Sequence, residues 1–140
     1  MQNRIAAASV AVLAVAGLGA CNPRHQTQIS STASVTVNGN DTKINTVNCT
    51  QLEWYRTIDI GGSFAGAKVV IDQRAEPLSA ESVRIQNLGG FTGMYSKHDG
   101  GDADMNLSGD KFTIIGTANG FRTDKPGEPA SATFKIIATC

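Results

Sequence analysis

The chain has 140 residues, with 12 lysines and arginines against 12 aspartates and glutamates, so its formal net charge is zero at pH 7. This length allows one small domain with short terminal segments. The balanced charge provides neither a basic face nor an acidic tail, which argues against a nucleic-acid partner.

The first residues have the features of a bacterial lipoprotein signal peptide. Ile5 to Leu18 is an apolar run too short to span a bilayer well. Leu18-Gly19-Ala20-Cys21 ends the run and resembles a lipobox, in which the leucine fills a hydrophobic subsite of the signal peptidase and the small residues admit the scissile bond. We predict that residues 1–20 are a cleaved signal peptide and that Cys21 carries diacylglycerol. An ordinary signal peptide and a buried apolar helix are the alternatives.

Residues 21–34 are predicted to form an acylated flexible tether. This segment contains Pro23 with several serines and threonines and almost nothing apolar, so it cannot bury enough surface to become ordered. No second apolar stretch of the sequence approaches membrane-spanning length. We therefore expect the lipid on Cys21 to hold the protein to the cell membrane, on the extracytoplasmic side of the envelope.

The pattern of residues 35–140 predicts a β-rich domain. Apolar and polar residues alternate, as in Asp102 to Ser108, where Ala103, Met105 and Leu107 share the inward face. Residues 74–82 are the longest irregular stretch inside the domain, and one helical turn at Ala80–Glu81 is expected there. With 15 glycines between short strands, the fold class is mainly β, a small antiparallel sandwich or barrel-like domain. The expected strands are Val35–Val37, Asn45–Thr50, Tyr55–Gly61, Phe64–Asp72, Val83–Leu88, Asp102–Ser108, Lys111–Gly120 and Ala132–Cys140.

Two cysteines remain if Cys21 is lipidated. Cys49 and Cys140 each fall in the inward phase of an expected strand, and an exported protein reaches an oxidising compartment. We predict a disulfide between them that closes a loop of about 90 residues, for which the chain-entropy account gives roughly 4.5 kcal/mol of stabilisation.

Several stretches resemble the mycobacterial nineteen-kilodalton lipoprotein antigen family, the LpqH-like lipoproteins. They are Val47–Thr50, Ile58–Gly62, Lys111–Gly120 and Phe134–Cys140, in the family's order and with a lipobox upstream. The chain departs from the family in a less threonine-rich tether and in an insertion-like Glu53–Arg56 segment. The resemblance implies an exported, acylated envelope protein, often glycosylated in its linker, recognised by host Toll-like receptor 2 and reported as an adhesin.

The resemblance also indicates where sugar would be attached. If the tether carries mannose, its exposed hydroxyls are the positions to expect. The expected partners are the membrane, through the lipid on Cys21, and, by the resemblance, Toll-like receptor 2. The sequence makes no prediction of the oligomeric state. The candidate O-glycosylation residues are Thr27, Ser30, Ser31 and Thr32.

Nothing in the sequence predicts a catalytic, metal or cofactor site. His98 is the one histidine of the expected domain, and no Gly-x-Ser-x-Gly elbow accompanies it. Asp102-x-Asp104-x-Asn106 matches the start of a calcium loop, but the alternation explains these residues as the solvent face of a strand.

We interpret the chain as a non-catalytic, lipid-anchored envelope protein that acts by display or binding. One alternative is a lipid- or glycan-binding carrier, and the other is a glycan hydrolase that uses a carboxylate pair such as Asp59 and Asp72. Five aromatic and methionine residues of the domain would either line a carrier's groove or cap the open ends of the sheet. These residues are Trp54, Tyr55, Phe91, Met94 and Tyr95.

Overall fold

The computed structural model describes residues 31–99 and 101–140, and every regular element in them is a β-strand. Short strands with alternating side chains and glycine-rich turns produce this all-strand structure. In chain order the strands are β1 (Ala33–Val37), β2 (Asn40–Ile44), β3 (Val47–Leu52), β4 (Tyr55–Gly61), β5 (Gly66–Asp72), β6 (Ser79–Leu88), β7 (Phe91–Ser96), β8 (Ala103–Ser108), β9 (Lys111–Arg122) and β10 (Lys125–Thr139).

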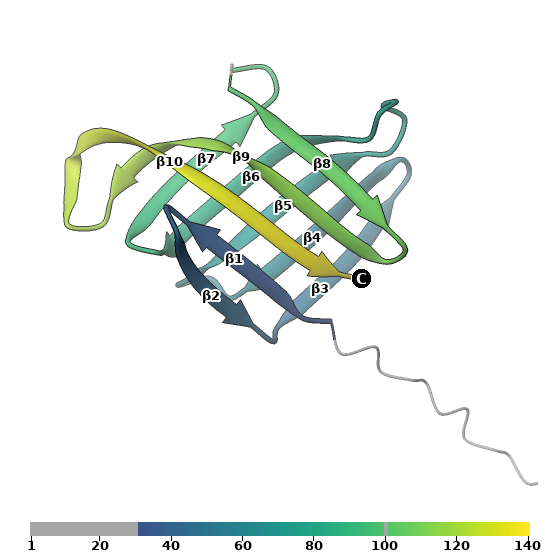
Figure 1. The fold of residues 1–140 in the computed structure, drawn as a ribbon, viewed down its shortest axis with the longest axis horizontal. Helices are drawn as coiled ribbons and strands as arrows, with labels where there is room; N and C mark the ends of the chain where they lie inside the picture. The colour runs from purple at the N-terminus through teal and green to yellow at the C-terminus, as the bar shows by residue number, and fades with distance from the viewer. Residues whose placement is uncertain (1–30, 100) are drawn as a thin grey trace, which may run out of the picture.

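The strands form one antiparallel sheet that curls back on itself (Figure 1). Their order is β2-β1-β10-β9-β7-β6-β5-β4-β3, with β8 added beside β9. In Figure 1, β1, β2 and β8 to β10 form the front layer, and β3 to β7 cross behind them. The two edges of the order, β2 and β3, are consecutive in the chain, so the sheet is nearly closed. The predicted fold class, mainly β and barrel-like, is confirmed.

Strand β9 connects the two layers by changing its partner. Its first half pairs with β8 and its second half with β7, while β10 pairs with β9 along nearly its whole length. Glycines permit this close approach, because a Cβ on Gly120 would lie 2.0 Å from the carbonyl oxygen of Thr92, and one on Gly116 would lie 2.4 Å from that of Asp102.

The inner face of the curled sheet holds a single apolar core. No polar or charged side chain is buried among the described residues, so the fold is held mainly by apolar burial, worth about 1.5–3 kcal/mol for each large aliphatic side chain. The largest fully buried side chains are Phe91, Ile58, Ile71, Ile85, Ile114, Ile136, Val35, Val37, Val69 and Val83.

Most of the expected strands are present, but β2 and β7 were not predicted. Asn38 and Gly39 both have positive φ, 48° and 83°, and turn the chain directly from β1 into β2. Strand β2 is a polar edge strand, and its composition resembles that of a loop. Strand β1 starts at Ala33, two residues before the expected domain, because Ala33 is buried in phase with Val35 and Val37.

We expected residues 74–82 to be irregular, with one helical turn. This prediction is wrong at the C-terminal end of the stretch. Strand β6 begins at Ser79, and Glu81 is an extra residue in its pairing with β5, because Ala80 and Ser82 face consecutive residues of β5. The bulge separates the inward residues Ala80 and Val83 by three positions, which is the spacing of a helix.

The inward alternation predicted for β8 is correct only in part. Ala103 and Met105 pack against the core, whereas Leu107 is 40% exposed. Strand β8 is paired on one side only, and Leu107 lies near its C-terminal end.

A disulfide joins Cys49 in β3 to Cys140, which follows β10, and confirms the predicted pairing. The Cα atoms of the two residues are 6.0 Å apart although 91 positions separate them in the chain. Both residues pack against the core. Because β10 lies two strands from the edge strand β2, the bond links the β3 edge to the opposite end of the strand order.

Replacing Cys49 by serine should lower the free energy of unfolding by about 2–5 kcal/mol, because the unfolded chain loses a long-range constraint. Urea unfolding under non-reducing conditions measures the change. The double variant Cys49→Ser/Cys140→Ser is the control and should be no less stable than either single variant. Equal unfolding midpoints for wild type and Cys49→Ser would contradict the prediction.

Candidate functional site

The predicted lipidation and signal-peptidase residues, Leu18 to Cys21, lie outside the described residues, as do Thr27 and Ser30. Of the candidate glycosylation positions, Ser31 and Thr32 are described. They directly precede β1, and the carbonyl oxygen of Thr32 accepts a hydrogen bond from the backbone N–H of Thr139 at 3.2 Å. This contact fixes the place where the chain from Cys21 joins the sheet, beside the end of β10.

The aromatic candidates do not form one groove. Phe91 and Tyr95 are buried in the core, and Met94 is exposed on β7. Trp54 and Tyr55 lie together at the turn between β3 and β4. The groove expected of a carrier is therefore not built from these five residues.

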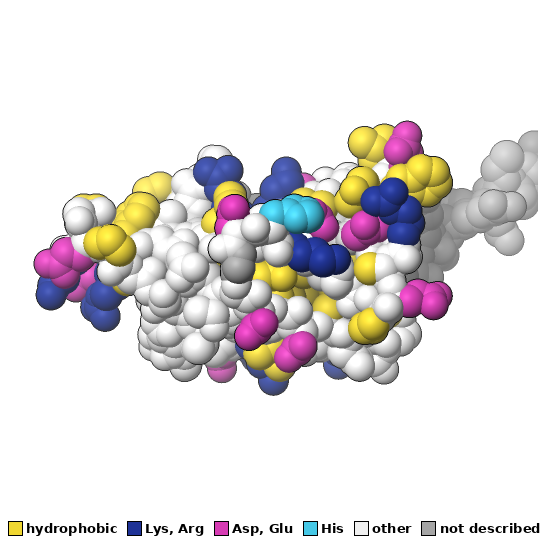
Figure 2. Space-filling model, turned by 90° about the horizontal axis from the view of Figure 1, so that it is seen from above, with side chains coloured by type: hydrophobic (Ala, Val, Ile, Leu, Met, Phe, Trp, Pro, Cys, Tyr) yellow, Lys and Arg dark blue, Asp and Glu magenta, His cyan; other side chains and the backbone are white. Residues whose placement is uncertain are grey.

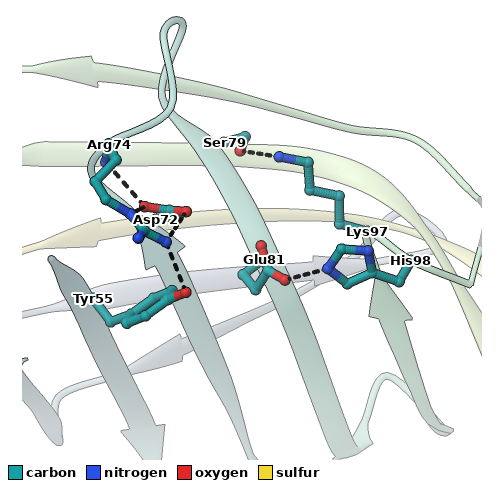
Figure 3. A network of polar contacts seen from close by, with 7 residues as sticks. All are labelled: Tyr55, Asp72, Arg74, Ser79, Glu81, Lys97 and His98. Atoms are coloured by element: carbon teal, nitrogen blue, oxygen red, sulfur yellow. Dashed lines mark hydrogen bonds and ion pairs between the residues drawn. The ribbon is translucent and has the colours of Figure 1, made fainter.

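Arg74 connects this turn to the loop after β5 (Figure 3). Its Nε and Nη2 atoms each donate a hydrogen bond of 3.0 Å to the carboxylate of Asp72, and Nη2 also donates one to the hydroxyl of Tyr55 at 3.0 Å. The guanidinium carbon lies 5.7 Å from the ring centroid of Trp54 and 5.4 Å from that of Tyr55. The hydrogen bonds of the Arg74 guanidinium and its contacts with the two rings hold the loop in place. The carboxylate of Asp72 compensates the charge of Arg74.

These contacts shift the titration of both charged groups. The hydrogen bonds from the Arg74 side chain and backbone hold the pKa of Asp72 below its ordinary value, against a smaller opposing effect of burial. The same hydrogen bond to Asp72 raises the pKa of Arg74.

His98 lies on the same side of the molecule but has no catalytic partner arrangement. Its Nε2 atom lies 2.8 Å from a carboxylate oxygen of Glu81, and the ammonium of the neighbouring Lys97 donates to the hydroxyl of Ser79 at 3.2 Å (Figure 3). Figure 2 shows basic and acidic side chains interspersed around the histidine rather than gathered in a patch of one sign. Nearby, the pKa of Tyr95 is raised mainly by burial and to a smaller extent by the negative charges of Asp102 and Glu81.

Asp59 and Asp72 do not form the carboxylate pair of a glycan hydrolase. In the sheet register Asp72 lies opposite Tyr55, four residues along β4 from Asp59, which corresponds to roughly 13 Å. Retaining and inverting glycosidases need about 5–9.5 Å. Each carboxylate also has its own cation, Lys68 at 3.5 Å and Arg74 at 3.0 Å.

The acidic residues of the possible calcium loop do not gather either. Asp104 and Asn106 are exposed along β8, with Asp102 just before it, as the strand alternation predicts. Within the described ranges no three histidine, cysteine, aspartate or glutamate side chains are placed to hold a metal ion.

Two depressions lie on the outer face of the sheet. One, of about 400 Å³, is lined by Lys43 and Lys111 beside the start of β1. The other, of about 320 Å³, is lined by Asp59, Lys68 and Arg84 next to the β4–β5 turn. The sequence did not predict that these lysine and arginine side chains would lie close together, because only the strand register brings them together.

Comparison with known proteins identifies the family. The Mycobacterium 19 kDa lipoprotein antigen family matches residues 26–140. The chain belongs to this family. A protein of Mycobacterium avium subsp. hominissuis that carries a lipoprotein name is 61% identical over 140 residues, which is 100% of this chain and 97% of that protein.

Two further relatives of this chain carry specific lipoprotein names. The "Probable lipoprotein LppE" of Mycobacterium tuberculosis is 30% identical over 141 residues, covering 100% of both chains. "Lipoprotein LpqH" of Mycobacterium avium is 32% identical over 108 residues, 76% of this chain and 66% of that protein. The lipoprotein names agree with an envelope-associated, lipid-anchored protein. Within residues 31–99 and 101–140, no helix has the length and apolar character needed to cross a membrane.

Removing the guanidinium of Arg74 should raise the pKa of Asp72 toward its ordinary value. Because the folded-state pKa of Asp72 is depressed, its contribution to stability is present above the pKa of the unfolded chain and is lost as pH falls through the folded value. Carboxyl-carbon NMR titration of wild type and Arg74→Gln measures the shift. The matched control is Arg122→Gln, which should release Asp124 and leave Asp72 unchanged. If Arg74→Gln leaves the pKa of Asp72 unchanged, another group must be responsible for the low pKa.

Proposed function

We propose that the protein is a non-catalytic lipoprotein, displayed on the extracytoplasmic side of the cell envelope and anchored by lipid on Cys21. The observation that carries the proposal is the match of residues 26–140 to the lipoprotein antigen family, and the lipobox-like sequence Leu18-Gly19-Ala20-Cys21 a few residues upstream supports it. In this proposal residues 1–20 are removed, and the chain before β1 serves as a tether.

The chemistry of the anchor supports stable attachment. A single acyl chain binds a bilayer only marginally, whereas two or three chains add about 0.8 kcal/mol for each buried CH₂ group. About a dozen residues separate Cys21 from β1, and a flexible segment of that length has a root-mean-square span of about 20 Å. The domain would thus remain close to the lipid headgroups.

The same acyl chains are the proposed ligand of host Toll-like receptor 2. Drawn from the membrane, they present an apolar group to a receptor with a matching channel, whereas the face of the domain in Figure 2 mixes charges of both signs. Glycans on the tether, at Thr27, Ser30, Ser31 or Thr32, belong to this proposal by family resemblance.

Replacing Cys21 by alanine should block acylation and processing at the normal site, loosen retention in the envelope and abolish Toll-like receptor 2 signalling. The physical reason is that the thiol is the attachment point of the lipid. Mass spectrometry of the membrane fraction and a receptor reporter assay measure the two effects.

The matched control is Cys49→Ser, which removes a different cysteine and should keep both acylation and signalling. Folding of the Cys21→Ala chain is checked by its intact Cys49–Cys140 bond. Equal receptor potency of acylated protein and folded Cys21→Ala protein, free of other lipoproteins, would move the activity into the β domain and overturn the proposal.

A further inference from the structure

The 320 Å³ depression on the outer face is lined by two cations that face each other across neighbouring strands. In the register of the sheet, Lys68 of β5 lies directly opposite Arg84 of β6. Like charges in this position destabilise a sheet by a few tenths of a kcal/mol up to about 1 kcal/mol. The Lys68–Arg84 pair therefore lowers the stability of the fold unless a negative group compensates its charge.

The protein supplies only part of that compensation. Asp59 lies on the other side of Lys68, opposite it in β4, with a carboxylate oxygen 3.5 Å from the ammonium. Arg84 has no ion pair or hydrogen bond with another side chain among the described residues, and its side chain is exposed. Lys68, Arg84 and Asp59 together leave one net positive charge in the depression.

Residues of the β4–β5 turn also line the depression. Gly61 has a φ of +79°, and a Cβ on Gly66 would lie 2.2 Å from the carbonyl oxygen of Ile60, so glycines allow the turn to fold against the sheet. This folding places Ser63 beside the depression. Gln86 lies opposite Gly66 and two residues along β6 from Arg84, and it lines the same depression.

We propose that this depression binds the phosphate group of a phosphate monoester. Arg84 offers a planar fork of donors that matches two phosphate oxygens, and Lys68 offers a point charge beside it. The amide of Gln86 and the hydroxyl of Ser63 are neutral donors for the remaining oxygens. The volume lies at the lower end of the range for small-ligand sites, which suits a phosphorylated small polyol or the headgroup of a phosphorylated lipid.

The test uses the full chain with Cys21→Ala, so that no acyl chain contributes. Because this chain keeps the apolar residues 1–20, vesicle binding is measured as the difference between vesicles with and without phosphatidic acid. Glycerol 1-phosphate is titrated by NMR and calorimetry, with glycerol as the uncharged comparison. A parallel arm measures sedimentation with phosphatidylcholine vesicles with and without phosphatidic acid, whose headgroup is a phosphate monoester. Backbone signals of the β4–β5 turn and of β6 near Arg84 should shift with glycerol 1-phosphate and not with glycerol.

Side-chain variants give the sharper result. Arg84→Gln and Lys68→Gln should each weaken binding about tenfold or more, since each removes a charge-assisted contact. Asp59→Asn should tighten binding, because it removes the competing negative charge. Lys135→Gln makes the same charge change on β10, away from the depression, and should leave binding within about twofold.

Each outcome decides the proposal. Binding of glycerol 1-phosphate with this variant pattern supports a soluble phosphate ester as ligand, and binding to phosphatidic acid vesicles alone with the same pattern assigns the site to a lipid headgroup. Absence of binding in both arms overturns the proposal. So does equal weakening by Lys135→Gln and Arg84→Gln, which would indicate attraction to the whole surface.

Discussion

Closure of a single sheet around one apolar core is the constraint on which the rest of the structure depends. A sheet of this length exposes an apolar inner face unless its two ends approach each other. Strand β9 makes the approach possible by leaving β8 and continuing beside β7, and glycines at 116 and 120 remove the side chains that would prevent it. The Cys49–Cys140 bond then links the β3 edge to the end of β10.

This closure determines where chemistry can occur. The core side chains are apolar, so the charged and hydrogen-bonding groups of the described residues lie on the outer face and in the turns. There they form separate small groups, such as the Arg74 cluster and the Lys68–Arg84 depression. The display role and the lipid attachment at Cys21 that we propose require no site in the core.

The alternation of side chains was sufficient to predict the fold class and the second half of β10, where every second residue from Ala132 to Ala138 is buried, but not the first half of that strand from Lys125. The disulfide was predicted from the two remaining cysteines and their inward phase together. The alternation failed at β6, because the bulge at Glu81 changes the spacing of inward residues from two to three. It also missed β2, whose polar residues serve at an exposed edge. The pairing of Lys68 with Arg84 was beyond reach, since it depends on a register that only the closed sheet determines.

The intact mass of the protein purified from its native envelope tests the account most directly, because cleavage, acylation, glycosylation and the disulfide all change it. We predict the mass of the chain from Cys21 to Cys140 plus a diacylglycerol group and further acyl chain, less two hydrogens for the Cys49–Cys140 bond, with added hexose if the tether is glycosylated. Loss of the lipid mass on cleavage within the tether would assign the acyl groups to Cys21. The mass of an unacylated chain, or of one that still contains residues 1–20, would contradict the account.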